Sequence, residues 1–203
     1  METSESKTRF SRRTKCLEVS LLADGKLGFE TSLVDESVGG QYEMGECGSL
    51  VIHHFAMSGT ASIDDLRLET LEVRAKEHPF PQCPFILPAT KELVGLSLLS
   101  GWRTNVLQRF GRAAGCTHLT TLLLGLSEVT TLMYFQRMNQ RASYGPEGRA
   151  SGAWIAGSID LGQNLGDACH ALRADGPVIQ QAKDFLQHRD HPATDPPQGV
   201  ASH

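Results

Sequence analysis

A thiol and an imidazole lie two residues apart in the most chemically suggestive stretch of this chain. Cys116 and His118 follow Gly115, and apolar residues with helical spacing begin directly afterwards. The first amides of a helix are unpaired and favour negative charge, so a thiolate at Cys116 would be stabilised there. Gly115 can take a positive φ that other residues resist. The pattern predicts a soft metal-ligand pair or a reactive thiol at a helix start.

Other histidine and cysteine side chains could join this pair from distant segments. His53 and His54 fall within an extended run, and Cys83 lies in a proline-rich segment. Two cysteines and two histidines can bind zinc in a closed tetrahedral site, or leave one position open to water. We therefore consider a zinc or other divalent metal centre of His53, Cys83, Cys116 and His118. The alternative is that these are buried thiols and ordinary polar histidines.

Two further chemistries need no metal. Cys116 could act as a nucleophile if His118, His53 or His54 accepts its proton. Alternatively, His53 or His54 could be a general base. The acid would then be Asp35, Asp64, Asp65 or Glu128, and a substrate carboxylate would be bound by Arg103 or Arg112.

The candidates for substrate binding are Arg103, Trp102 and Tyr134. For Trp102 we favour packing of the indole at a turn over stacking on a ligand. For Tyr134 and its apolar neighbours we favour a core or subunit-contact stripe over a cofactor pocket.

Composition limits the class of protein. A chain of 203 residues, 40% hydrophobic and 21% charged, can bury a core as one domain. Its net charge of −4 disfavours a nucleic-acid partner. The sequence contains no Gly-rich phosphate loop, so we expect no nucleotide cofactor. Five cysteines, an odd number, favour reduced thiols. With no long apolar segment and no apolar signal core, we expect a cytoplasmic protein with no membrane contact.

The first half alternates apolar and polar residues in the manner of strands. The segments 17–21 and 27–33 flank an Asp24-Gly25 turn and predict a hairpin. The runs 50–58 and 66–76 predict two further strands. An antiparallel sheet of about four strands needs something packed on its face.

The covering element must come from the second half. Four prolines within 78–88 predict an irregular segment, whereas apolar spacing predicts a long helix over 117–141. The patterns over 159–172 and 178–188 predict weaker helical or mixed segments. The expected fold is α+β, with an antiparallel sheet of about four strands packed against a long helix and smaller C-terminal helices. We expect a flexible arm at 1–13, a single α+β domain at 14–188 and a disordered tail at 189–203.

A succession of short motifs extends over about residues 10–140. It comprises Arg12-Arg13, Leu33-Val34-Asp35, Ile52-His53, Pro81-Gln82-Cys83, Leu93-Val94-Gly95, Gly101-Trp102 and Gly115-Cys116-Thr117-His118-Leu119. This succession resembles the bacterial family catalogued as domain of unknown function 2889. That family has His-Asp-Met where this chain has His53-His54-Phe55, and Glu-Leu-Leu where it has Thr120-Thr121-Leu122. Because His53, Cys83, Cys116 and His118 all match, the resemblance implies a shared metal or thiol site.

The resemblance also implies a role in aromatic or acyl-thioester catabolism, and therefore a small organic substrate. We expect a lyase that performs retro-aldol deformylation or decarboxylation, since such chemistry needs a base for a hydroxyl proton and an electrophile for the developing anion. The alternatives are an ester or thioester hydrolase and a non-catalytic, zinc-stabilised accessory protein. The expected partner is an aromatic or carboxylated small molecule, and the apolar helix is compatible with a homodimer.

Overall fold

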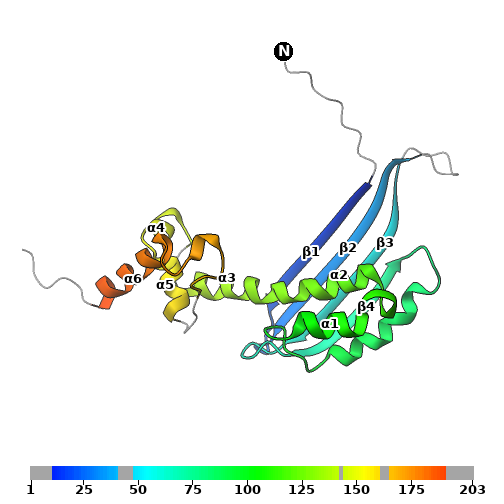
Figure 1. Ribbon diagram of the computed structural model, residues 1–203, viewed down its shortest axis with the longest axis horizontal. Helices are drawn as coiled ribbons and strands as arrows, with labels where there is room; N and C mark the ends of the chain where they lie inside the picture. Colours follow the sequence, from blue (N-terminus) through cyan, green and yellow to red (C-terminus); the bar gives the residue numbers. More distant parts are fainter. Residues whose placement is uncertain (1–10, 41–47, 142–143, 161–164, 191–203) are drawn as a thin grey trace, which may run out of the picture. The chain divides into compact units, whose positions relative to one another are not determined.

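The first half of the chain forms the predicted antiparallel sheet. The structure is a computed structural model that describes residues 11–40, 48–141, 144–160 and 165–190. Its contacts divide the chain into two compact units, Met1–Thr131 and Leu132–His203, which we describe separately. The sheet of the first unit has the order β1-β2-β3-β4 (Figure 1). Its strands are β1 (Ser11–Leu21), β2 (Leu27–Gly40), β3 (Gly48–Ala61) and β4 (Leu68–Glu77).

The predicted Asp24-Gly25 turn is confirmed and sets the register of the first hairpin. Gly25 has a φ of +82°, which glycine adopts at little cost, and the Lys26 amide donates to Asp24 Oδ1 at 3.2 Å. Leu21 therefore pairs with Leu27, and each earlier residue of β1 pairs with a later residue of β2.

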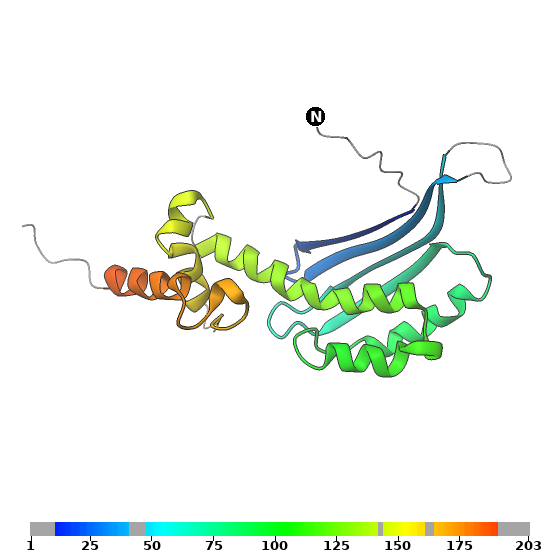
Figure 2. The same cartoon turned by 45° about the horizontal axis from the view of Figure 1, so that its top comes forward.

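One face of the sheet carries the apolar core. Leu33 and Phe55 are fully buried on β2 and β3, and each such side chain contributes about 2 kcal/mol by leaving water. The helix α2 (Thr117–Gly125) contacts both strands, and α1 (Trp102–Phe110) packs on α2. Figure 2 shows both helices, in green, on the same side of the sheet. The fold class is therefore α+β, as predicted.

Two helical predictions need correction in detail. The segment 78–88 is not wholly irregular, because the 3₁₀ helix η1 (Cys83–Leu93) begins within it and packs against β4. Proline is tolerated at the start of a helix, where Pro84 lies. The predicted helix over 117–141 has the correct ends, but a 3₁₀ turn, η3 (Leu126–Glu128), separates α2 from α3 (Val129–Arg141).

The second unit is helical and has its own small core. It contains α4 (Pro146–Ala150), α5 (Ala153–Asp160), the 3₁₀ turn η4 (His170–Leu172) and α6 (Pro177–Asp190). Ile155 and Ala156 of α5 pack with Ile179 and Ala182 of α6. The helix predicted over 178–188 is confirmed. The described residues of 159–172 are mixed: they include the end of α5, a turn in which Asp167 has a φ of +64°, and η4.

The predicted terminal segments lie largely outside the described residues. Where the chain is described, residues 11–13 belong to β1 and residues 189–190 to α6. Within the described ranges, no helix has both the length and the apolar character that a membrane span requires.

Candidate functional site

A row of three functional side chains crosses the sheet. The strand register places Arg13 of β1 opposite Asp35 of β2, and Asp35 opposite His53 of β3. Residues directly opposite one another in antiparallel strands share a face and come within contact distance. Since Leu33 and Phe55 lie two residues away along the same strands, this is the face that the helices cover.

Arg13 holds Asp35 in its ionised form. Its Nε donates to Asp35 Oδ1 at 2.6 Å and its Nη2 to Oδ2 at 2.8 Å, which is the two-pronged geometry of a strong charge-assisted pair. These hydrogen bonds are the main reason that the pKa of Asp35 lies below its ordinary value. The site therefore contains a fixed carboxylate at neutral pH.

His118 reaches this carboxylate from the first turn of α2. Cys116 precedes the helix with an extended backbone, and its carbonyl accepts the Thr120 amide at 2.8 Å. Gly115 is also extended, with a φ of −147°, so it does not use the positive φ that glycine allows. Glycine is needed here for another reason, because a Cβ would lie 2.1 Å from the Phe110 carbonyl oxygen.

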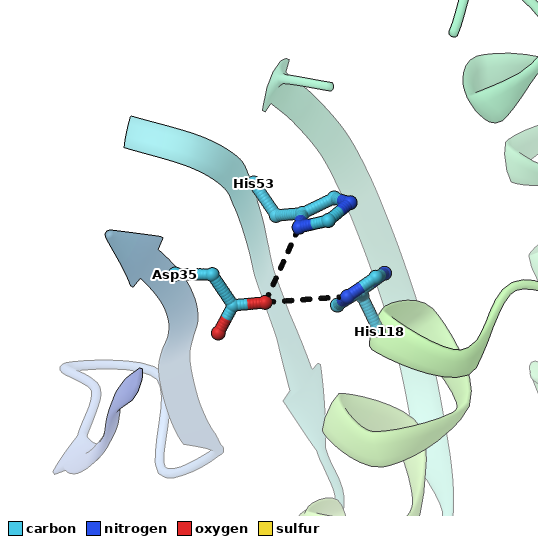
Figure 3. A group of neighbouring side chains, drawn as sticks. All are labelled: Asp35, His53 and His118. Atoms are coloured by element: carbon cyan, nitrogen blue, oxygen red, sulfur yellow. Dashed lines mark ion pairs between the residues drawn. The ribbon is translucent and has the colours of Figure 1, made fainter. Parts of the chain in front are cut away.

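The two imidazoles stack on each other and share one oxygen of Asp35. Oδ2 lies 3.3 Å from His53 Nδ1 and 3.2 Å from His118 Nε2 (Figure 3). The ring centroids are 3.6 Å apart, and the planes differ by 24°.

The pKa of His118 is lowered, first by burial and then by the nearby His53 and Arg13, while Asp35 acts in the opposite direction. His118 is consequently a neutral imidazole at neutral pH.

The second nitrogen of His118 faces a thiol. Cys116 Sγ lies 3.7 Å from His118 Nδ1, while Nε2 faces Asp35. If the proton is on Nε2, as the carboxylate favours, Nδ1 is left as a proton acceptor. A base oriented by a carboxylate and facing a thiol is the arrangement that nucleophilic cysteine chemistry uses.

An open groove gives access to this cluster. It has a volume of about 680 Å³, within the range of small-molecule sites, and is lined by His53, His118, Cys116, Cys83 and the neighbouring residues Phe80, Gln82, Phe85, Ile86, Ala113, Ala114, Gly115 and Thr117. The structure thus brings all four predicted ligand residues to one groove. A second open groove, on the Arg13 side, also reaches His53 and His118.

The arrangement fits a metal ion only after movement. Asp35, His53 and His118 each offer a ligand atom, and these atoms lie within 4.8 Å of one another. No other three His, Cys, Asp or Glu residues of the described chain meet this condition. Two imidazoles on one tetrahedral zinc have centroids roughly 5 Å apart, given Zn–N bonds of about 2.0 Å. Here the centroids are 3.6 Å apart. The rings would have to separate by over ~1 Å to bind one ion, so the zinc centre stays a prediction.

The structure places the remaining predicted residues elsewhere. His54 lines a groove on the opposite face of the sheet, as expected for the neighbour of His53 in a strand. Trp102 is buried, and its indole N–H donates to the Leu123 carbonyl at 2.6 Å, which is the packing role favoured from sequence. Arg103 is exposed and lines neither groove, and Tyr134 belongs to the second unit.

Apart from Asp35, which lies in the cluster, the candidate acids and the second candidate cation, Arg112, are exposed as well. Asp65 is engaged with Ser62 and Arg67 in a turn, and Asp64, Glu128 and Arg112 lie outside the groove. Arg13 is the member of the charged cluster that the sequence analysis did not name as a candidate.

These features define an α+β protein with a carboxylate–imidazole pair held between a sheet and a covering helix. The family model described as protein of unknown function (DUF2889) matches residues 10–132, and the chain belongs to this family. The match includes every residue of the cluster and of the groove. Among the curated proteins and the solved structures there is no match to this chain.

Proposed function

We propose that this protein is a small-molecule enzyme in which His118 is the general base and the His53–Asp35 pair supplies a proton. A carbon–carbon lyase is the proposed reaction class. The observation that carries the proposal is that one oxygen of Asp35 faces two stacked imidazoles beside a groove. Titratable groups that share a site but differ in environment are a common source of paired acid and base roles.

A retro-aldol deformylation uses both members of such a pair. His118 removes the proton of a substrate hydroxyl, the adjacent carbon–carbon bond breaks, and the oxygen becomes the carbonyl of formaldehyde. The electron pair of the broken bond stays on the remaining carbon, which takes a proton from a ring N–H of His53. Decarboxylation needs the same final proton transfer. General acid–base catalysis of this kind contributes about 10²- to 10⁴-fold.

A thiol hydrolase is the second candidate, because Cys116 Sγ lies 3.7 Å from His118 Nδ1. In that reaction His118 takes the thiol proton, and the thiolate attacks an ester or thioester carbonyl at the N-terminus of α2. The alcohol or thiol leaves with the proton from His118, and water then hydrolyses the acyl-enzyme to release the acid. This mechanism requires Cys116 and one imidazole, and leaves the second imidazole without a role. The stacked pair therefore favours the lyase.

Two probe reactions distinguish these candidates. The lyase probe is 3-hydroxy-1-phenylpropan-1-one, whose retro-aldol cleavage releases formaldehyde and acetophenone, and the hydrolase probe is phenyl thioacetate. We expect formaldehyde release that His118→Gln abolishes and Cys116→Ser retains, with His54→Gln as the matched control on the opposite face. Thioester hydrolysis lost in both Cys116→Ser and His118→Gln, without formaldehyde release, would replace the lyase by the hydrolase.

A metal-dependent form of the enzyme and a zinc-stabilised accessory protein need a separate test. Elemental analysis of the purified protein beside His118→Ala and Cys116→Ser measures metal content directly. A stoichiometric metal lost in His118→Ala would assign His118 as a ligand and favour a metal centre over the metal-free pair. A metal lost in both variants, without turnover of either probe, would favour the accessory protein.

A further inference from the structure

Two phenylalanines beside the site are exposed to an unusual degree. Phe85 is 76% exposed and Phe80 is 64% exposed, the highest values among the large apolar side chains of the described residues. Both line the groove that contains His118 and Cys116. Exposed phenyl groups contribute little to folding, because their apolar surface stays in water. Their position at the groove therefore calls for a role other than core packing.

The backbone holds these two residues in place. The Cys83 amide donates to the Phe80 carbonyl at 3.0 Å, and the Phe85 amide donates to the Gln82 carbonyl at 3.0 Å. His78 Nδ1 also lies 3.0 Å from the Phe80 carbonyl. The rings of Pro81 and Pro84 fix the φ of these two residues. The phenyl groups are thus presented by an ordered segment and would lose little backbone entropy on binding a ligand.

The rest of the groove is lined by small and uncharged residues. Ala113, Ala114 and Gly115 line it beside the cluster, and Ile86 adds a further apolar side chain. None of the lining residues, all of which the structure describes, is Lys, Arg, Asp or Glu. The guanidinium of Arg13, on the other side of the cluster, is engaged with Asp35. The groove therefore offers aromatic and aliphatic contacts but no cation for a carboxylate or phosphate.

We propose that the groove binds an uncharged aromatic ring of the substrate, with Phe80 and Phe85 as the residues that determine this specificity. The ring lies against the two phenyl groups and the alanine–glycine segment, so that a hydroxyl-bearing side chain on it reaches His118 and Cys116. This inference rests on the proposed function for the reacting end of the substrate. For the other end of the substrate, the inference favours a neutral aryl group over the carboxylate that the sequence analysis also allowed.

Binding measurements test this inference without turnover. The probes are 3-phenylpropan-1-ol, its saturated counterpart 3-cyclohexylpropan-1-ol and the anion 3-phenylpropanoate, each titrated calorimetrically into the full chain. Aromatic pairs contribute about 0.5–1.5 kcal/mol beyond their buried area. The wild type should therefore bind the aryl alcohol about 3- to 10-fold more tightly than the cyclohexyl alcohol, and more tightly than the anion.

The variants assign the effect to the two phenylalanines. Phe80→Leu and Phe85→Leu keep an apolar side chain and should each raise the Kd of the aryl alcohol about 3- to 10-fold. Phe135→Leu is the matched control, since Phe135 is 44% exposed and lies in the second unit. Equal affinity for the two alcohols, tighter binding of the anion, absence of binding, or unchanged Kd values in both leucine variants would each overturn the inference.

One further variant separates this inference from the proposed function. His118→Gln should still bind the aryl alcohol, because the readout does not require proton transfer. If the aryl preference fails while His118→Gln abolishes formaldehyde release, only the substrate class is wrong. If the preference holds while turnover is unaffected by His118→Gln, the assigned base is wrong instead.

Discussion

Replacing Gly115 by alanine tests the backbone contact that places Cys116 and His118 beside the sheet. The added Cβ would lie 2.1 Å from the Phe110 carbonyl oxygen, whereas real Cβ atoms essentially never approach other atoms closer than 3.0 Å. Phe110 is only 1% exposed and cannot give way easily. The chain at Gly115 must therefore shift by about 1 Å, and overpacking of this kind costs about 1–3 kcal/mol.

The same shift should disturb the cluster. His118 Nε2 lies 3.2 Å from Asp35 Oδ2, so a displacement of about 1 Å moves it beyond hydrogen-bonding distance. Urea unfolding measures the loss of stability, and the NMR signals of the His118 ring report the displacement.

Gly125→Ala is the matched control, since Gly125 has a helical backbone and nothing lies within 4 Å of its Cβ position. It should gain about 0.5–1 kcal/mol and leave the His118 signals unchanged. The reasoning is refuted if Gly115→Ala has wild-type stability and wild-type His118 signals.

Three further perturbations follow from the contacts of the first unit. Asp35→Asn should lower the pKa of His118, because the carboxylate favours the charged ring, and NMR titration would contradict this by showing an unchanged or higher pKa. Since burial already lowers the pKa of His118, the unfolded chain binds a proton that the folded chain does not. The free energy of unfolding should be fully maintained above pH 6.5 and should fall as the pH decreases below it. Urea unfolding of the wild type and His118→Gln from about pH 8 to about pH 5 measures this difference, and identical pH dependence would exclude it. Trp102→Phe should lose about 1–2 kcal/mol, because its buried N–H donates to Leu123, and an unchanged urea midpoint would argue against that contact.

The sheet and part of the site could be predicted from local sequence. Alternation and the Asp24-Gly25 turn determine the first hairpin, in which the numbers of paired residues sum to 48, as in Leu21 with Leu27. That register places Arg13 opposite Asp35, so this ion pair was within reach of sequence reasoning. The expected flexible arm at 1–13 instead includes Arg13, because composition alone does not reveal that β1 begins at Ser11.

The remaining contacts depend on features that local patterns do not encode. The pairing of Asp35 with His53 follows from a register that shifts directly after Asp35, and part of the connection lies outside the described residues. His118 meets Asp35 only because α2 packs on β2 and β3. The choice between His53 and His54 was more accessible, since strand alternation puts His53 on the same face as the apolar Phe55. Glycine is required at position 115 because the backbone there lies close to the Phe110 carbonyl, and local patterns do not reveal this contact.

The central claim is that His118, held by Asp35, is the catalytic base. The most direct test is the rate of formaldehyde release from 3-hydroxy-1-phenylpropan-1-one as a function of pH, for the wild type, His118→Gln and Asp35→Asn. The wild-type rate should rise to a plateau around a pKa below 6.5, because burial lowers the pKa of His118. Both variants should be about 10²-fold or more slower. A wild type that releases no formaldehyde, or a His118→Gln variant with the wild-type rate and pH profile, would contradict the account.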